Sequence, residues 1–341
     1  MGTEALAGVD VSSEPKLAIA DIRMARERIA GRVRKTPLVA SPTLSAETGA
    51  SVYLKLEHLQ ITGSFKLRGA TNAILRLTAE ERARGVVGVS TGNHGRGLAQ
   101  AAKDTGARCI ICMSRLVPKN KIEGIRALGA EVRIVGESQD DAQVEVDRLV
   151  AKEGMVMLPP FDHRDVIAGQ GTLGLEVMED VPDVETLLVP VSGGGLIAGV
   201  ALAAKTLKPS LRVVGVSMER GAAMYESLRA GRPVQVTELP TLADALGGGI
   251  GLHNHHTFAM VRDLVDDLLL VNEAQIAQAI RHAYWEEKQV IEGSGAVGIA
   301  ALLAGVLRPR GVTAVVLSGG NIDMTLHHRI ISGEDVDVTG A

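Results

Sequence analysis

Residues 187–205 read LLVPVSGGGLIAGVALAAK, an apolar run followed by a glycine-rich turn and then by a helical pattern of small and apolar residues. The same succession, or its apolar first part, recurs along the chain in residues 86–103, 109–128, 131–153, 211–216 and 312–317. Strands that alternate with helices of about 10–15 residues are typical of βαβ units, which form parallel sheets with helices on both faces. The pattern therefore predicts an α/β fold in which ligands bind at the carboxyl ends of the strands.

The chain has 341 residues, enough for two domains or for one large domain. Its net charge is −4, only 2% of its residues are aromatic, and it has no stripe of basic residues. A nucleic-acid-binding surface needs clustered Lys and Arg, so we expect no nucleic-acid partner. We also expect no membrane association, because no run of about 18 apolar residues occurs. Residues 1–16 lack a basic region followed by an apolar one, so we expect no secretory signal.

The only two cysteines, Cys109 and Cys112, have the C-x-x-C spacing of redox and zinc sites. No second pair completes a zinc site, and the residues around these two are apolar. We therefore expect both thiols to lie in a buried strand. So few cysteines are typical of a reducing compartment, which predicts a cytoplasmic location.

Lys66 lies in the segment GSFKLRGA, residues 63–70. Glycines let a backbone approach a ligand closely, and Phe65 offers a flat face for stacking. A desolvated lysine is a nucleophilic amine that forms a Schiff base. An isolated lysine is more often a solvated residue at the start of a helix, but the other motifs favour the nucleophile.

Residues 191–199, VSGGGLIAG, follow a predicted strand and begin the next helix. The glycine amides and the helix N-terminus would form an anion site, for which a phosphate is the natural ligand. A tight turn that needs small residues is the structural alternative. The segment also matches a dinucleotide-binding pattern, with Glu219 about 20 residues further on, so a nicotinamide-dependent oxidoreductase is a second interpretation.

Residues 90–95, STGNHG, form another turn between a predicted strand and a helix. Backbone amides, two hydroxyl groups and the Asn93 amide would converge there, which suits a carboxylate or a phenolic oxygen. The alternative is a capping turn, because Ser, Thr and Asn are good helix caps. His94 taken alone is more often a structural histidine.

Two further turns are less specific. Residues 318–321, SGGN, end the last clear strand, where the Ser318 hydroxyl would face a ring nitrogen. Residues 244–251 are rich in glycine without a clear preceding strand, which fits a mobile loop near the site or a plain turn. Three histidines follow, at His253, His255 and His256. Since no carboxylate or cysteine completes a known spacing with them, we expect no metal site.

Together these motifs resemble those of the serine/threonine dehydratase family, fold-type II enzymes that use pyridoxal phosphate. The resemblance covers residues 22–332 and keeps several separated motifs in order, so it is specific. It implies the tryptophan synthase β-like fold, with two open twisted sheets, mostly parallel, and helices on both faces. It also implies a large cofactor-binding domain of residues 1–56 and 158–341, a small inserted α/β domain of residues 57–157, and a homodimer.

The resemblance gives each motif a role. Lys66 resembles the Schiff-base lysine, with Phe65 near the cofactor ring. Asn93 would bind the ring hydroxyl, and Ser318 would face the pyridine nitrogen. The substrate carboxylate would be held by the turn of Ser90, Thr91, Gly92, Asn93 and His94. The phosphate loop would consist of Ser192, Gly193, Gly194, Gly195 and Leu196.

The activity implied is β-elimination of water from a β-hydroxy-α-amino acid, which yields a 2-oxo acid and ammonia. A nicotinamide enzyme would leave Lys66, Asn93 and Ser318 without a role. A cysteine-synthase-like β-replacement enzyme is the nearer alternative, although such enzymes usually carry a threonine-rich phosphate loop. A second alternative activity is that of a 3-hydroxyaspartate ammonia-lyase. Its substrate has a second carboxylate, for which Arg68, Arg96 and Arg115 are candidate ligands. The alternative for these three arginines is that they are solvated surface charges.

Longer stretches at residues 113–119, 217–224 and 242–247 look most like the hydroxyectoine-utilisation branch of the family. The general alternative is threonine or serine degradation. Two features differ from other members. Ser217, Gly221 and Ala223 stand where some relatives have carboxylates that bind a divalent cation, so no metal is expected. The chain ends shortly after the last motif, so we expect no C-terminal regulatory module.

Overall fold

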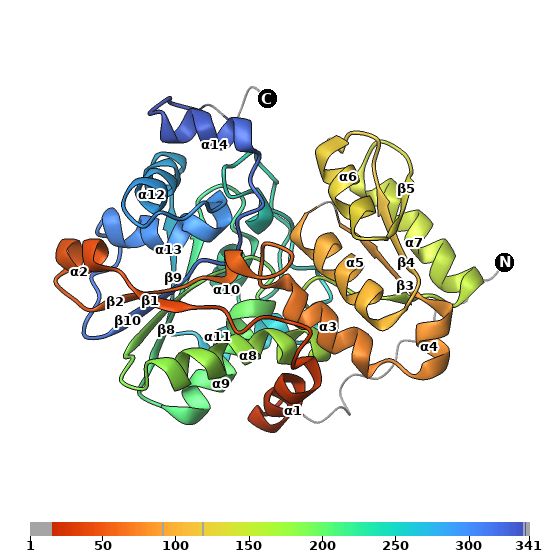
Figure 1. Cartoon of the computed structure of the whole chain (residues 1–341), viewed down its shortest axis with the longest axis horizontal. Coiled ribbons are helices and arrows are strands. Elements are labelled where there is room, and N and C mark those ends of the chain that lie inside the picture. The colour runs from red at the N-terminus through yellow and green to blue at the C-terminus, as the bar shows by residue number, and fades with distance from the viewer. Residues whose placement is uncertain (1–15, 91, 118, 337, 339–341) are drawn as a thin grey trace.

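Two separate β-sheets form the framework of the molecule and confirm the predicted α/β class (Figure 1). The computed structural model describes residues 16–90, 92–117, 119–336 and 338. In this part of the chain, no helix has both the length and the apolar character needed to cross a membrane.

The larger sheet has six strands in the order β1-β2-β10-β7-β8-β9. β1 is antiparallel to β2, and all other neighbours are parallel. These strands are β1 (Leu38–Ala40), β2 (Val52–Lys55), β7 (Thr186–Pro190), β8 (Arg212–Met218), β9 (Asp267–Val271) and β10 (Thr313–Val316).

Helices cover both faces of the larger sheet, because its strand residues alternate between two cores. Leu188 and Val216 pack toward α12 (Glu273–Trp285) and α13 (Gly293–Leu303). Leu187 and Val213, from the same two strands, pack on the opposite face toward α8 (Arg164–Asp180) and α9 (Gly195–Leu207). The remaining helices of this half are α1 (Ile19–Ile29), α2 (Pro42–Thr48), η2 (Glu57–Leu59), α10 (Ala223–Ala230), η3 (Asp244–Leu246), α11 (Thr257–Leu264) and α14 (Met324–Ile331).

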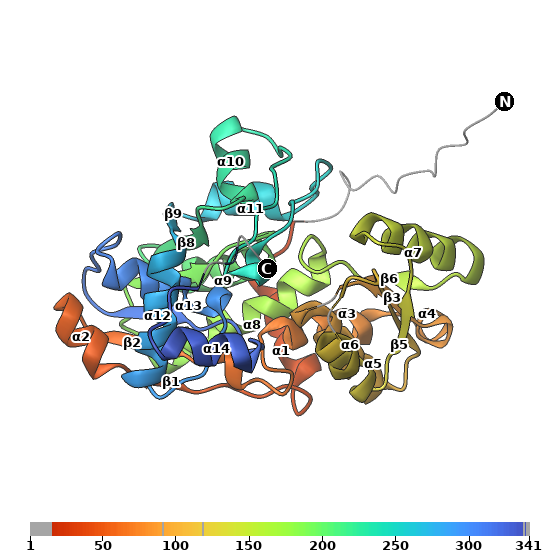
Figure 2. The same cartoon turned by 90° about the horizontal axis from the view of Figure 1, so that it is seen from above.

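The smaller sheet has four parallel strands in the order β5-β4-β3-β6. They are β3 (Val86–Val89), β4 (Cys109–Met113), β5 (Glu131–Ile134) and β6 (Val156–Met157). Figure 2 shows α7 on one face of this sheet and α3, α5 and α6 on the other. The helices of this half are α3 (Lys66–Arg76), α4 (Ala79–Arg84), α5 (Asn93–Thr105), α6 (Lys119–Ala127) and α7 (Gln139–Glu153).

Both cysteines lie in β4, as the apolar sequence around them predicted. Cys109 packs into the core under α3 and α5, whereas Cys112 packs into the core under α7. Burial raises the pKa of Cys109 to about 12 and that of Cys112 to about 11. Two unreactive thiols on opposite faces of a sheet serve as small core residues.

Helix α8 holds α3 in place through very close backbone contacts. A Cβ atom added at Gly169 would lie 2.6 Å from the Arg68 carbonyl oxygen, and one at Gly199 would lie 2.4 Å from the Ile167 carbonyl oxygen. Glycine is therefore required where α8 meets α3 and α9. The first residue of α3 is Lys66, so this packing also fixes the position of Lys66 relative to the larger sheet.

Candidate active site

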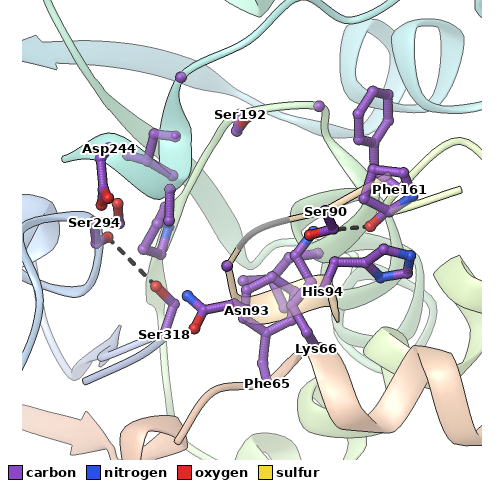
Figure 3. A pocket seen from close by; sticks show the side chains of 18 of the residues that line it. Phe65, Lys66, Ser90, Asn93, His94, Phe161, Ser192, Asp244, Ser294 and Ser318 are labelled. Carbon is purple, nitrogen blue, oxygen red and sulfur yellow. Dashed lines mark hydrogen bonds between the residues drawn. The ribbon is translucent and has the colours of Figure 1, made fainter. Parts of the chain in front are cut away.

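A cavity of about 250 Å³ lies where the predicted glycine-rich turns meet (Figure 3). Its wall includes the turns that follow β3, β7 and β10 and the start of α3. The carboxyl ends of parallel strands are where α/β proteins bind ligands. The predicted site residues that line it are Phe65, Lys66, Ser90, Gly92, Asn93, His94, Ser192, Gly193, Gly194, Gly195, Leu196 and Ser318. Thr91, which was also predicted, lies outside the described residues.

Lys66 presents an amine inside this cavity, and no carboxylate of the described residues is its partner. Its Nζ donates a hydrogen bond to the Pro160 carbonyl oxygen at 2.8 Å and lies 5.3 Å from the centre of the Phe65 ring. Burial lowers the pKa of Lys66 to about 8. A substantial fraction of the amine is therefore neutral near physiological pH, which is the state that acts as a nucleophile or a base.

The turn after β7 forms an anion cradle that tolerates only glycine. A Cβ atom at Gly193 would lie 2.3 Å from the Phe161 ring, and one at Gly195 would lie 2.9 Å from the Phe161 backbone. Gly194 has a φ of 88° and is the N-cap of α9, with no side chain capping the helix. The free amides at the start of α9 are thus available to a phosphate.

Asn93 and His94 belong to the first turn of α5, so this helix begins within the segment of residues 90–95 that was predicted as a turn. Gly95 donates its backbone N–H to the Ser90 hydroxyl at 3.0 Å, which closes the turn. The His94 Nε2 lies 2.9 Å from the Leu158 carbonyl oxygen. Burial, together with the charge of Lys66, lowers the pKa of His94 to about 4. His94 is therefore a neutral wall residue whose side chain is already hydrogen-bonded.

Ser318 and Ser294 place two hydroxyl groups on the opposite side of the cavity (Figure 3). The Ser318 hydroxyl donates a long hydrogen bond of 3.4 Å to the Ser294 carbonyl oxygen. The Ser294 hydroxyl is buried and has no hydrogen-bond partner in the part of the chain that the structure describes. Since buried polar groups are normally paired, this hydroxyl indicates that the cavity is built around a polar ligand.

Several residues that line the cavity lie outside the predicted motifs, and the most important of them is Glu292. It is buried at the N-cap of α13 and accepts a hydrogen bond of 2.6 Å from the Asn93 side chain. Asn321, at the end of the predicted SGGN turn, donates to the Asn93 Oδ1 at 2.6 Å. No signal in the sequence around Glu292 indicates this contact, because its partner Asn93 lies 199 positions away.

The three candidate arginines have three different environments. Arg96 lines the cavity. Arg115 is exposed and donates to the Gly136 carbonyl oxygen, away from the cavity. Arg68 is fully buried and paired with two carboxylates, those of Glu57 and Glu176, so it is neither a substrate ligand nor a solvated charge. The expectation for Arg68 was therefore wrong, because its partners could not be read from the local sequence.

No group of three metal-binding side chains occurs within the described residues. The loop of His255 and His256 is instead held by Asp162, whose carboxylate accepts both of their backbone N–H groups, at 2.6 and 2.8 Å. This contact fixes the start of α11 beside the segment that carries Phe161.

The cavity therefore brings together a nucleophilic amine, a glycine-rich turn with free backbone amides, the Asn93 amide and several serine hydroxyl groups. This donor set fits pyridoxal phosphate. Lys66 would hold the aldehyde carbon, the Gly193–Gly195 amides the phosphate, and Asn93 and Ser318 the polar atoms of the ring. These individual roles remain predictions.

Comparisons with known proteins agree with this fit. A family model described as "Pyridoxal-phosphate dependent enzyme" matches residues 29–319. A Sinorhizobium fredii protein named "Putative threonine dehydratase" is 62% identical over 93% of this chain and 96% of its own length. The L-threonine ammonia-lyase of Thermotoga maritima is 46% identical over 93% of this chain and 78% of its own.

A comparison with a solved structure shows that the fold is shared as well. The structure of maize serine racemase superposes with a TM-score of 0.88 and 34% identity, over 93% of this chain and 98% of the other. The chain therefore belongs to the pyridoxal-phosphate dependent enzyme family, as a fold-type II member of its serine/threonine dehydratase group, and its cofactor is pyridoxal 5′-phosphate.

Proposed function

We propose that this enzyme eliminates water from a β-hydroxy-α-amino acid and that hydrolysis of the resulting imine, which consumes one water, releases a 2-oxo acid and ammonia. Threonine and serine are the simplest such substrates. The observation that carries this proposal is the Lys66 amine, which shares one cavity with the glycine cradle, Asn93 and Ser318. Two similar proteins that bear threonine dehydratase and threonine ammonia-lyase names support it. The nicotinamide alternative, which relied on Glu219, is rejected because the family match accounts for the same glycines.

Pyridoxal phosphate supplies an electron sink for the bond that breaks at the α-carbon. The chain's own residues would move the proton and orient the substrate. The amine of Lys66, with a pKa lowered to about 8, takes the α-proton. The turn at residues 90–94 orients the substrate carboxylate. Ser318 would face the ring nitrogen with a hydroxyl group, which is a weaker partner than a carboxylate and would favour prompt loss of the β-hydroxyl group.

A more specialised substrate is part of the proposal. Arg96, Lys121 and Asp244 all line the cavity, and the methyl group of threonine needs none of these charges. Together with the stretches at residues 113–119, 217–224 and 242–247, they support a hydroxylated intermediate of hydroxyectoine breakdown as the substrate. Arg96 supports 3-hydroxyaspartate as the second candidate, because a guanidinium binds a carboxylate through two hydrogen bonds.

The test is the 2-oxo acid formed from threonine, serine, 3-hydroxyaspartate and hydroxylated intermediates of hydroxyectoine breakdown. Lys66→Ala should abolish turnover in every case. Arg96→Ala should lower kcat/KM at least about tenfold for the acidic substrate alone, or about 1.4 kcal/mol, if Arg96 recognises its second carboxylate. Arg115→Ala is the matched control, because Arg115 lies outside the cavity. Rapid thiol addition without any 2-oxo acid would instead establish the β-replacement activity.

The assembly and location are also proposals. The strands of the smaller sheet fall between residues 86 and 157, which supports a small inserted domain of residues 57–157 within a larger one. We propose a homodimer in the cytoplasm. Light scattering at micromolar concentration tests the dimer, and a monomeric mass would contradict it.

A further inference from the structure

Glu292 is a buried carboxyl group whose hydrogen-bond partners are both neutral. It is 4% exposed and accepts from the Asn93 Nδ2 at 2.6 Å and from the Asn321 backbone N–H at 3.1 Å. Glu57 and Glu176, which are also buried, are instead paired with Arg68. A buried carboxyl group that none of the described cations pairs with directly is costly, so its presence at the cavity wall calls for a function.

Asn321 completes a hydrogen-bond network in which the donors and acceptors can be assigned in only one way. Its Nδ2 donates to the Thr62 carbonyl oxygen at 2.9 Å and to the Asn93 Oδ1 at 2.6 Å. A backbone carbonyl can only accept, so Thr62 fixes which end of the Asn321 amide is the donor. The Asn93 Oδ1 must then face Asn321, and the Asn93 Nδ2 must face Glu292.

Turning the Asn93 amide over would break both of its contacts. Its NH₂ group would meet the NH₂ group of Asn321, and its oxygen would meet the Glu292 carboxylate. Asn93 follows a strand of the smaller sheet, whereas Glu292 and Asn321 follow elements of the larger one. The network therefore fixes the orientation of a cavity amide across the two halves of the molecule.

We propose that Glu292 and Asn321 are positioning residues that hold the Asn93 amide with its second N–H directed toward the cofactor's ring oxygen. This inference rests on the proposed role of Asn93 toward the cofactor. It adds that the amide is oriented by this network before the cofactor binds, which lowers the cost of binding.

The charge on Glu292 should tune this contact. Burial, with a smaller contribution from the charge of Asp244, raises the pKa of Glu292 to about 7. Below that pH the carboxyl group is neutral; above it, the carboxylate makes a stronger, charge-assisted hydrogen bond with Asn93. The other charged or titratable groups at this cavity are Lys66, His94, Arg96, Lys121 and Asp244.

The test compares cofactor binding by Glu292→Gln, Asn321→Ala and the wild type. In Glu292→Gln, the new amide can satisfy either Asn93 or the Asn321 N–H, but not both. We expect each variant to bind pyridoxal phosphate at least about tenfold more weakly, as measured by absorbance titration of the apo-protein. We also expect the pH-dependent change in the visible band of the wild-type holoenzyme near pH 7 to be absent in Glu292→Gln.

Glu287→Gln is the matched control. The side chain of Glu287 is only 8% exposed and is held by the hydroxyl groups of Ser41 and Thr43 and by the His282 Nε2 at 3.3 Å, but it does not line the cavity. Glu287→Gln should leave both the affinity for pyridoxal phosphate and the pH-dependent change in the visible band unchanged. Thermal melts monitor folding, and Asn321→Ala, at a partly exposed position, provides the second variant if Glu292→Gln is unstable.

The proposal is overturned if Glu292→Gln and Asn321→Ala both retain wild-type cofactor affinity and pH profile. It is also overturned if activity falls while affinity and spectrum do not change, because Glu292 would then act on the substrate rather than through Asn93. A wild-type protein that binds the cofactor but forms no 2-oxo acid would contradict the proposed function and leave this test valid.

Discussion

The Nζ of Lys121 lies 3.2 Å from a carboxylate oxygen of Asp244, and both side chains line the cavity. Lys121 belongs to α6, which packs on the smaller sheet, whereas Asp244 belongs to η3, beside the core of the larger sheet. The pair therefore joins the two halves of the molecule across the cavity. Since both side chains are partly exposed, we expect the pair to contribute at most about 1 kcal/mol to folding.

Asp244→Asn should consequently change substrate preference more than stability. Removing this negative charge should lower KM several-fold for a substrate with a carboxylate beyond the β-carbon. It should raise KM for a substrate with an ammonium group there and leave KM for threonine nearly unchanged. Steady-state kinetics on the three substrate types checks this, with thermal melts as the control for folding. Equal changes for all three would show that Asp244 does not meet the side chain of the substrate.

The rate at which apo-protein is loaded with pyridoxal phosphate should report the protonation of Lys66. The neutral amine is the reactive form, and burial lowers the pKa of Lys66 from its ordinary value of 10.5 to about 8. The rate should therefore rise as the pH increases from 6 to about 8 and level off above that. Stopped-flow absorbance measures it. A rate that still rises steeply at pH 10 would show that the amine is not desolvated.

Gly193→Ala and Gly195→Ala should both weaken cofactor binding, but only the first should be rescued by Phe161→Ala. The Cβ added at Gly193 would meet the Phe161 ring, which Phe161→Ala removes. The Cβ added at Gly195 would meet the Phe161 backbone, which no side-chain substitution at Phe161 relieves. Cofactor affinities of the two double variants, measured against Phe161→Ala alone, separate the cases. Rescue of both would mean that the segment around Phe161 moves easily.

The sequence predicted much of this fold, because apolar runs followed by glycine turns mark the strands and the helices after them. Strands β3, β4 and β5 begin at the predicted residues. Helix α8 is different: it is buried almost all round, so no polar face gives it a helical period. Such a helix cannot be distinguished from other apolar segments by pattern alone.

The cavity was predictable where its residues lie within single motifs, as at Lys66 and Gly193. It was not predictable where two distant segments meet. Asn93 and Glu292 are 199 positions apart, and nothing local to either residue indicates the other. Arg68 shows the same limit, since its partner Glu176 lies 108 positions further on.

The buried ionic cluster around Arg68 should be the most sensitive part of the framework near Lys66. Arg68 pairs with Glu57 and Glu176, and Lys55 donates to Glu176 at 2.6 Å. Removing Arg68 would leave the buried Glu57 carboxylate without its ion-pair partner, and loss of one partner of a buried pair typically costs about 3–5 kcal/mol. We therefore expect Arg68→Met to lower the free energy of unfolding by that order, as measured by urea denaturation. Arg262→Met, which removes an exposed pair with Asp263, should have no measurable effect.

The same cluster should make stability depend on pH in the acid range. Burial alone would raise the pKa of Glu57, but the Arg68 guanidinium, the Thr36 hydroxyl and the charge of Lys55 together outweigh burial and hold that pKa below its ordinary value of 4.5. A lowered pKa in the folded state means that Glu57 stabilises the fold above about pH 4.5 and that this contribution is lost as the pH falls further. Glu57→Gln should flatten the decline in unfolding free energy between pH 5 and pH 3. An unchanged decline would show that other carboxylates govern acid unfolding.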